Sequence, residues 1–87
     1  MSDQTLLEFP CEFPIKLMGR DTPSFRSTMR ALVEKHAGRL SDDAIQCSLS
    51  RNGHFVSITI TVEAQSQRQF DAIYRDATDH TDVSMAL

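Results

Sequence analysis

Tryptophan is absent from this chain of 87 residues, and cysteine, glycine and proline are scarce, at two, three and three residues. Two cysteines are too few for a disulfide scaffold, so reduced thiols are expected. Three glycines cannot build a phosphate cradle of the usual kind, and no Walker A, GxGxxG, GxSxG or HExxH pattern occurs. We therefore expect no cofactor and no enzymatic activity.

Long apolar runs and an excess of basic charge are also lacking. No segment approaches the roughly 18 to 20 apolar residues that cross a bilayer. The start, "MSDQTLLEFP", has no basic region, apolar run or small-residue cleavage site typical of a signal peptide, which favours a cytoplasmic protein. A net charge of -3 and a pI near 5.4 lack the electrostatic footprint that phosphate-backbone binding normally needs.

The length and the 40% hydrophobic content fit one small domain with one core. Residues 1–8 carry no periodicity and are expected to form a flexible N-terminal arm, which leaves residues 9–87 as the domain. Domains of this size bury only about 60 to 65% of their unfolded surface, so stability is modest and oligomerisation is a plausible supplement.

The ordered pattern opens with a strand and a helix. Pro14, within the strand, has no amide to donate, so that end should lack a neighbour or carry an irregularity. Gly19 permits a turn, Thr22 can cap the helix, Pro23 suits the first helical position and Gly38 is a natural stop. The alternating strand residues are Phe13, Ile15 and Leu17, and the helical stripe comprises Phe25, Met29, Leu32, Val33 and His36.

The second half predicts a hairpin, a helix and a last strand. Asn52-Gly53 is a strong signal for a type I′ hairpin turn, and Ser66 with Gln69 is typical of a capping box. The three strands alternate at Ile45, Cys47 and Leu49, then at Val56, Ile58, Ile60 and Val62, and last at Val83, Met85 and Leu87. The second helical stripe is Phe70, Ile73, Tyr74 and Ala77.

The order β-α-β-β-α-β predicts an α+β, ferredoxin-like plait: a four-stranded antiparallel sheet in the order 4-1-3-2 with both helices on one face. The opposite face is then open, and the two edge strands favour a homodimer. The open face is lined by Lys16, Gln46, Ser48, Ser57, Thr59 and Thr61.

The same topology bears on the cysteines and histidines. Cys11 and Cys47 should lie about two strand spacings apart, roughly 9 to 10 Å, which is too far for a disulfide. No CxxC spacing occurs, and His36, His54 and His80 are scattered over a helix end, a hairpin and a loop. We expect two free thiols and no metal site.

One weak candidate for a ligand site is "GRDTPS", a glycine-containing turn that leads into a helix N-terminus. Free amides, the helix dipole and a basic side chain there favour an anion. The alternative interpretation is a capped helix start that needs no ligand. The candidate ligand-binding residues are Gly19, Arg20, Asp21, Thr22 and Ser24.

A nucleic-acid-binding module that uses the open sheet face is the alternative from another class, because this plait is also the fold of RNA-recognition modules. Those modules stack bases on aromatic side chains of the two central strands. Here the outward positions read Lys16, Ser57, Thr59 and Thr61, and Phe55 beside the turn is the one aromatic. Nucleic acid is therefore not expected as a partner.

Four segments together carry a resemblance that covers essentially the whole chain: "LLEFPCEFPIKLMG", "SRNGHFVSITITVEA", "YRDA" and "VSMAL". They resemble the YbeD-like family of small bacterial proteins, with its FP..F..K.MG opening and S..G.(Y/F).S(V/I)T hairpin. The resemblance implies a plait similar to the ACT regulatory domains, which bind amino acids and often dimerise. Family members are also labelled proposed lipoate regulatory proteins.

The ACT ligand turn typically reads D-x-P-G followed by an aliphatic residue. Residues 21–25 follow that outline with Ser24 in place of the glycine. A side chain at this position limits close backbone approach by a ligand. What the resemblance implies is a regulatory or interaction domain that binds a small-molecule effector or a protein partner.

Overall fold

A computed structural model describes residues 8–87, so the predicted arm at residues 1–8 lies outside the described residues except for Glu8. The elements, in chain order, are β1 (Cys11–Arg20), α1 (Pro23–Ala37), the short 3-10 turn η1 (Asp42–Ala44), β2 (Ile45–Leu49), β3 (Phe55–Ala64), α2 (Gln67–Asp79) and β4 (Val83–Ala86). The predicted order β-α-β-β-α-β is confirmed. Neither helix is long and apolar enough to span a membrane.

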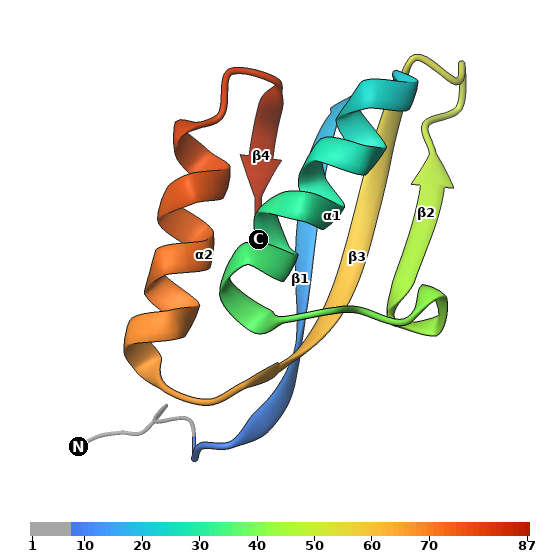
Figure 1. The fold of residues 1–87 in the computed structure, drawn as a ribbon. Helices are drawn as coiled ribbons and strands as arrows, with labels where there is room; N and C mark the ends of the chain where they lie inside the picture. Colours follow the sequence, from blue (N-terminus) through green and yellow to red (C-terminus); the bar gives the residue numbers. More distant parts are fainter. Residues whose placement is uncertain (1–7) are drawn as a thin grey trace, which may run out of the picture.

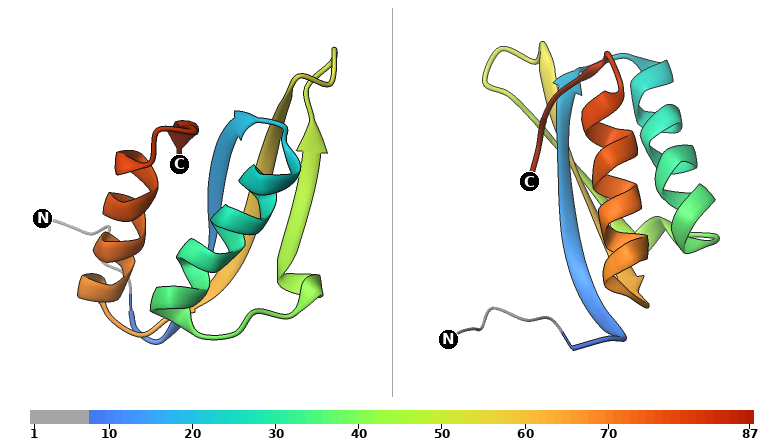
Figure 2. Two further views of the ribbon diagram at one scale, coloured as in Figure 1. Left: turned by 45° about the horizontal axis from the view of Figure 1, so that its top comes forward. Right: turned by 90° about the vertical axis from the view of Figure 1, so that its left-hand side faces the viewer.

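The four strands form one antiparallel sheet in the order β2-β3-β1-β4, which confirms the predicted topology. β1 and β3 pair along their whole lengths, from Cys11 opposite Ala64 to Arg20 opposite Phe55. Both helices cover the same face of the sheet, and the other face is open (Figures 1 and 2). The molecule is therefore a two-layer plait with one sheet face that no helix covers.

Both helices begin where the sequence predicts a cap. The Thr22 hydroxyl accepts the amide of Phe25 at 3.0 Å, and the Ser66 hydroxyl accepts that of Gln69 at 3.1 Å. α1 ends at Gly38, whose φ of 82° is a left-handed conformation that costs glycine little. The second hydrogen bond of the capping box differs from the usual pattern. The Gln69 side chain accepts the amide of Gln65, the residue before the cap, and not that of Ser66.

The core lies between the helices and the inner face of β1 and β3. Side chains of both central strands are almost fully buried there, which explains why β3 is the longest alternating segment in the sequence. A ring cluster closes one side, with Phe70 edge-on to Phe13 at 4.8 Å and to Tyr74 at 4.9 Å between centroids. The core residues are Ile15, Leu17, Phe25, Met29, Val33, Leu40, Val56, Ile58, Ile60, Val62, Ile73 and Ala77.

The β2–β3 hairpin is wider than the two-residue turn that Asn52-Gly53 favours. Ser50 donates its amide to Phe55 at 2.8 Å, and Gly53 donates back to Ser50 at 2.9 Å, so residues 51–54 form the connection. Gly53 has a φ of 78°. Asn52 holds the turn with its side chain, which accepts the amide of His54 at 3.1 Å.

The last strand does not keep the simple alternation that the sequence shows. A register shift between Met18 and Gly19 of β1 sets Ala86 opposite Leu17, facing the core, and turns Met85 outward with half of its surface exposed. Which side chains of β4 face the core is thus set by its register with β1. Pro14 lies beyond the paired end of β4, which reaches Lys16 through Leu87, as its missing amide predicts.

The cysteines are free thiols, as predicted, and the strand order places β3 between them. Cys11 lies opposite Ala64, and Cys47 lies opposite Ile58 further along β3. Cys47 is exposed, because no helix covers β2.

Candidate functional site

A cavity of about 360 Å³ lies where four segments meet: the end of β1, the start of α1, the start of β3 and the turn between α2 and β4. We call it the Arg20 cavity. Three of the five predicted site residues line it, and Gly19 and Asp21 lie next to them in the chain without being part of the lining. The lining residues are Arg20, Thr22, Ser24, Phe55, Thr81, Asp82 and Ser84.

Arg20 and Phe55 form one wall of the Arg20 cavity. They are register partners at the ends of β1 and β3, and the guanidinium carbon lies 5.5 Å from the ring centroid. Such a cation-π contact holds the guanidinium in place at modest energy, about 0.5 to 1 kcal/mol at an exposed site. The ring itself is 44% exposed. This wall therefore offers an oriented positive charge beside an accessible aromatic face.

Thr22 and Ser24 bring hydroxyl groups and the first turn of α1. The two hydroxyls lie 3.2 Å apart, and Thr22 also receives the amide of Phe25. Pro23 has no amide N–H, and the amide of Phe25 is used by the cap. Of the first three residues of α1, only Ser24 therefore has an amide that could donate to a ligand. The helix N-terminus thus presents fewer donors than the sequence pattern suggests, because capping uses them.

Asp21 belongs to the scaffold. Its amide donates to the carbonyl of His54 at 2.9 Å, which ties β1 to the hairpin. Its carboxylate accepts two hydrogen bonds from Arg26, at 2.9 and 3.1 Å, and this pairing raises the pKa of the Arg26 guanidinium. The carboxylate is therefore already engaged within the first turn of α1, which corresponds to the alternative interpretation of this segment as a capped helix start.

Gly19 lies inside β1, and the expectation of a turn there is wrong. A Cβ at this position would collide with the carbonyl oxygen of Asp82 and lie 2.6 Å from Cζ of Phe25. The absent side chain is required by close packing of three chain segments and not by a positive φ. Because Gly19 has no side chain, the turn before β4, which carries Asp82 of the Arg20 cavity, can lie close to β1.

Four lining residues were not predicted from the sequence as site residues: Phe55, Thr81, Asp82 and Ser84. The last three come from the other end of the chain, and Ser84 donates its hydroxyl to the carbonyl of Met18 at 3.1 Å. The predicted strand order contained the signal, because an antiparallel β4 beside β1 brings the residues that precede β4 to the end of β1.

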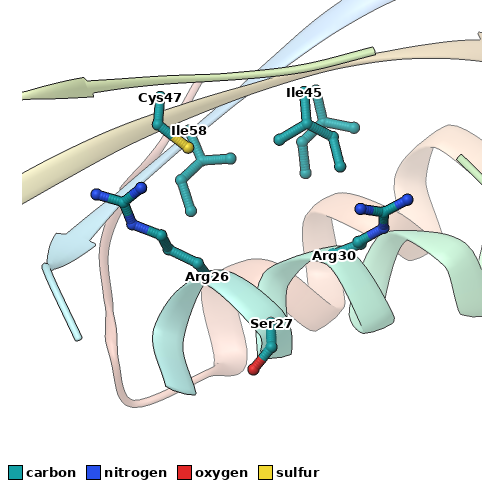
Figure 3. Close-up of a pocket in the computed structure, with 7 residues that line it drawn as sticks. Arg26, Ser27, Arg30, Ile45, Cys47 and Ile58 are labelled. Atoms are coloured by element: carbon teal, nitrogen blue, oxygen red, sulfur yellow. The ribbon is translucent and has the colours of Figure 1, made fainter. Parts of the chain in front are cut away.

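A second hollow, of about 270 Å³, lies between α1 and β2 (Figure 3). We call it the α1/β2 groove. Arg26 extends toward Cys47 at one side, and Arg30 lies on the side of Ile45. Its floor is apolar, and its lining residues are Arg26, Ser27, Arg30, Ile45, Cys47, Ile58 and Ile60.

A polar clasp joins the two helices on the outer side of the layer. Nε2 of His36 lies 2.6 Å from Oδ2 of Asp76, and Nζ of Lys35 lies 2.9 Å from the same oxygen. These contacts lower the pKa of the Asp76 carboxyl, the His36 hydrogen bond being the larger cause. His36, which the helical stripe placed on the apolar face, acts here as a helix-to-helix contact.

Across residues 8–87, no three His, Cys, Asp or Glu side chains come together in a way that could hold a metal ion. The polar groups of the Arg20 cavity are a guanidinium, four hydroxyls and the carboxylate of Asp82. Such groups can bind and orient a small charged molecule.

The fold and the Arg20 cavity define a small α+β plait domain with a polar hollow where the end of β1 and the start of α1 meet the start of β3 and residues 81–84. The chain belongs to the family described as "Protein of unknown function (DUF493)", whose match covers residues 4–87. The YbeD-like resemblance is thereby confirmed.

Similar chains agree with this assignment over their full lengths. The UPF0250 protein of Chromobacterium violaceum is 42% identical over 89 residues, and the UPF0250 protein NE1487 of Nitrosomonas europaea is 37% identical over 87 residues; each alignment covers all of both chains. The solution structure of protein HP0495 from H. pylori matches with a TM-score of 0.79 at 17% identity, over 99% of this chain and 90% of that one. That likeness supports the fold alone.

Proposed function

We propose that this protein is a non-enzymatic, cytoplasmic regulatory domain of the ACT-like kind, which binds a small metabolite in the Arg20 cavity. The observation that supports the proposal is convergence: Arg20, Thr22 and Ser24, predicted from a local motif, meet Asp82 and Ser84 from the other end of the chain in one cavity. Ligand contacts on both the start of α1 and the turn before β4 would couple binding to both helices.

The ligand class follows from the polar groups. A guanidinium held against an aromatic ring binds a carboxylate through paired hydrogen bonds. The Thr81 hydroxyl and one of the paired Thr22 and Ser24 hydroxyls add donors, while the Ser84 hydroxyl, which donates to Met18, can accept. Asp82 offers a carboxylate for an ammonium group. A cavity of about 360 Å³ fits a small ligand. These features favour an amino acid or a small carboxylate, a class that includes lipoate.

The test is a thermal-shift screen of the wild-type chain with amino acids, lipoate and related carboxylates at millimolar concentration. A ligand present at a hundred times its Kd stabilises the folded state by about 2.7 kcal/mol, which is readily visible in a small domain. We expect Arg20→Gln to abolish the shift. Arg75→Gln, which removes an exposed guanidinium from α2, should leave it intact.

Two outcomes count against this proposal. Stabilisation by none of the compounds would favour a protein-binding role for the same domain. A shift that survives Arg20→Gln would place the ligand elsewhere on the molecule.

A nucleic-acid-binding module is the second candidate, favoured by one observation: Phe55 and Arg20 form an exposed aromatic and basic pair on the open sheet face. Single-stranded nucleic acids stack on such groups. Fluorescence anisotropy with labelled oligonucleotides at low salt tests it. Binding that weakens with salt and with Phe55→Ala would favour this function over metabolite binding.

A further inference from the structure

The two edges of the sheet differ in how the helices cover them. α2 packs on β4, whereas β2 makes its main contacts with β3 and lies outside the helix layer (Figures 1 and 2). Ile45 is half-buried, Cys47 is exposed and Leu49 is 55% exposed, although all three point to the helix side of the sheet. An edge strand with uncovered apolar side chains is a site for pairing with another strand.

The backbone groups that this edge offers can be assigned from the hairpin. The amide of Ser50 donates to the carbonyl of Phe55 across the turn, so Ser50 directs its backbone groups toward β3. Antiparallel pairs alternate between hydrogen-bonded and non-hydrogen-bonded positions, so every second residue of β2 does the opposite. The residues that direct their backbone groups to the free edge are Ile45, Cys47 and Leu49.

We propose that a second copy of this chain pairs with β2 in antiparallel fashion, with Cys47 of both copies on the two-fold axis. In this register Ile45 faces Leu49 of the other copy, and all three outward-directed residues exchange hydrogen bonds. Leu49 of each copy then covers the apolar side of its neighbour at the α1/β2 groove, where Ile45 and Ile58 form the floor (Figure 3). The two sheets join into one of eight strands.

The charged residues that flank β2 favour pairing with a second copy of the chain, and favour the antiparallel direction. Asp42 and Asp43 precede the strand, and Arg51 follows it. Antiparallel pairing centred on Cys47 brings Asp43, in the 3-10 turn before β2, to the same end as Arg51, in the turn after β2 of the second copy. Parallel pairing would bring like charges together. The strand is therefore complementary to itself in one orientation only.

The arginines of the α1/β2 groove do not oppose this arrangement. Arg26 is paired with Asp21, and Arg30 contacts Glu34 at 3.2 Å and Asp42 at 2.9 Å. Arg30 also donates to the carbonyl of Leu40 at 2.6 Å. Acidic partners within the same copy thus compensate the charges of both arginines, so the two copies do not repel each other through them.

The first test uses the thiol on the axis. Residues opposite each other at a hydrogen-bonded antiparallel position have Cα atoms about 5.5 Å apart, which a short bismaleimide spans. With Cys11→Ser, so that Cys47 is the one thiol, we expect a covalent dimer at low micromolar protein. With Cys11→Ser, Cys47→Ser and Thr61→Cys, which moves the thiol to the open face, we expect only the background of random collision. Equal cross-linking of the two variants would overturn the proposal.

The second test measures mass by light scattering. We expect the wild type at twice the 9.8 kDa of the monomer and Leu49→Asp at the monomer mass. Met85→Asp, a matched change at an exposed residue of β4, should stay dimeric. A monomeric wild type, or dissociation by Met85→Asp and not by Leu49→Asp, would overturn the proposal. Asp43→Arg and Arg51→Asp should each weaken the dimer, and their combination should restore it.

This inference is independent of the ligand in the Arg20 cavity. The two can fail separately, since Arg20→Gln tests the ligand and Leu49→Asp tests the interface. A monomeric chain that still binds a carboxylate would refute the dimer and leave the proposed function standing.

Discussion

Gly19 is the residue at which three segments of the chain come closest. The carbonyl of Asp82 and the ring of Phe25 occupy the space that a side chain would need. Both neighbours are fixed, the first because it is backbone and the second because Phe25 is only 1% exposed in the core. The Arg20 cavity therefore depends on a residue that contributes no functional group to it.

Gly19→Ala should destabilise the fold by about 1 to 3 kcal/mol, the usual cost of inserting a methyl group into a packed site. Urea unfolding followed by circular dichroism measures the change. Ser48→Ala, an exposed change on β2, should stay within about 0.5 kcal/mol of the wild type. If Gly19→Ala is equally neutral, the close approach of the β4 turn to β1 is wrong.

At the scale of elements, the clasp between α1 and α2 makes stability depend on pH. Its carboxylate, Asp76, has a pKa below the ordinary value, chiefly because of the hydrogen bond with His36 and then that with Lys35. A lowered pKa in the folded state means that the folded chain holds the charged form more strongly than the unfolded chain. The contribution is present above the unfolded pKa, about 3.9, and is lost as pH falls through the lower folded value.

Asp76→Asn removes this contribution and should make the urea midpoint less sensitive to pH between neutral pH and pH 3. The wild type should lose more of its midpoint over that range than the variant. Asp79→Asn, on the same helix and without an ion pair among residues 8–87, should follow the wild type. Parallel curves for the wild type and Asp76→Asn would show that the clasp does not form in solution.

Elements also show how far the sequence could predict this structure. Both helix starts were predictable, because Thr22 and Ser66 act through local hydrogen bonds. Which β4 side chains face the core was not predictable, since it depends on a register shift between β1 and β4, a feature of the pair and not of either strand alone. The same holds for the site: its local half, Arg20, Thr22 and Ser24, was predictable from a motif, but its other half required tertiary structure.

For the whole molecule, one core implies one cooperative transition. A chain of 87 residues has a total stability of about 4 to 13 kcal/mol. Ile60 is fully buried on β3, which contacts both neighbouring strands and both helices. Replacing it by alanine should cost about 2 to 5 kcal/mol, a large part of the total.

Ile60→Ala should therefore lower the stability of every element together. Tyr74 packs on Phe70 in the helix layer, so its fluorescence reports α2, while far-ultraviolet circular dichroism reports all elements. We expect the two probes to give one midpoint in the wild type and one lower midpoint in the variant. Thr59→Ala, the adjacent change on the open face, should move the midpoint far less, because that side chain packs against no helix. Separate midpoints for the two probes would mean that α2 unfolds before the sheet and that the helix layer and the sheet do not share one core.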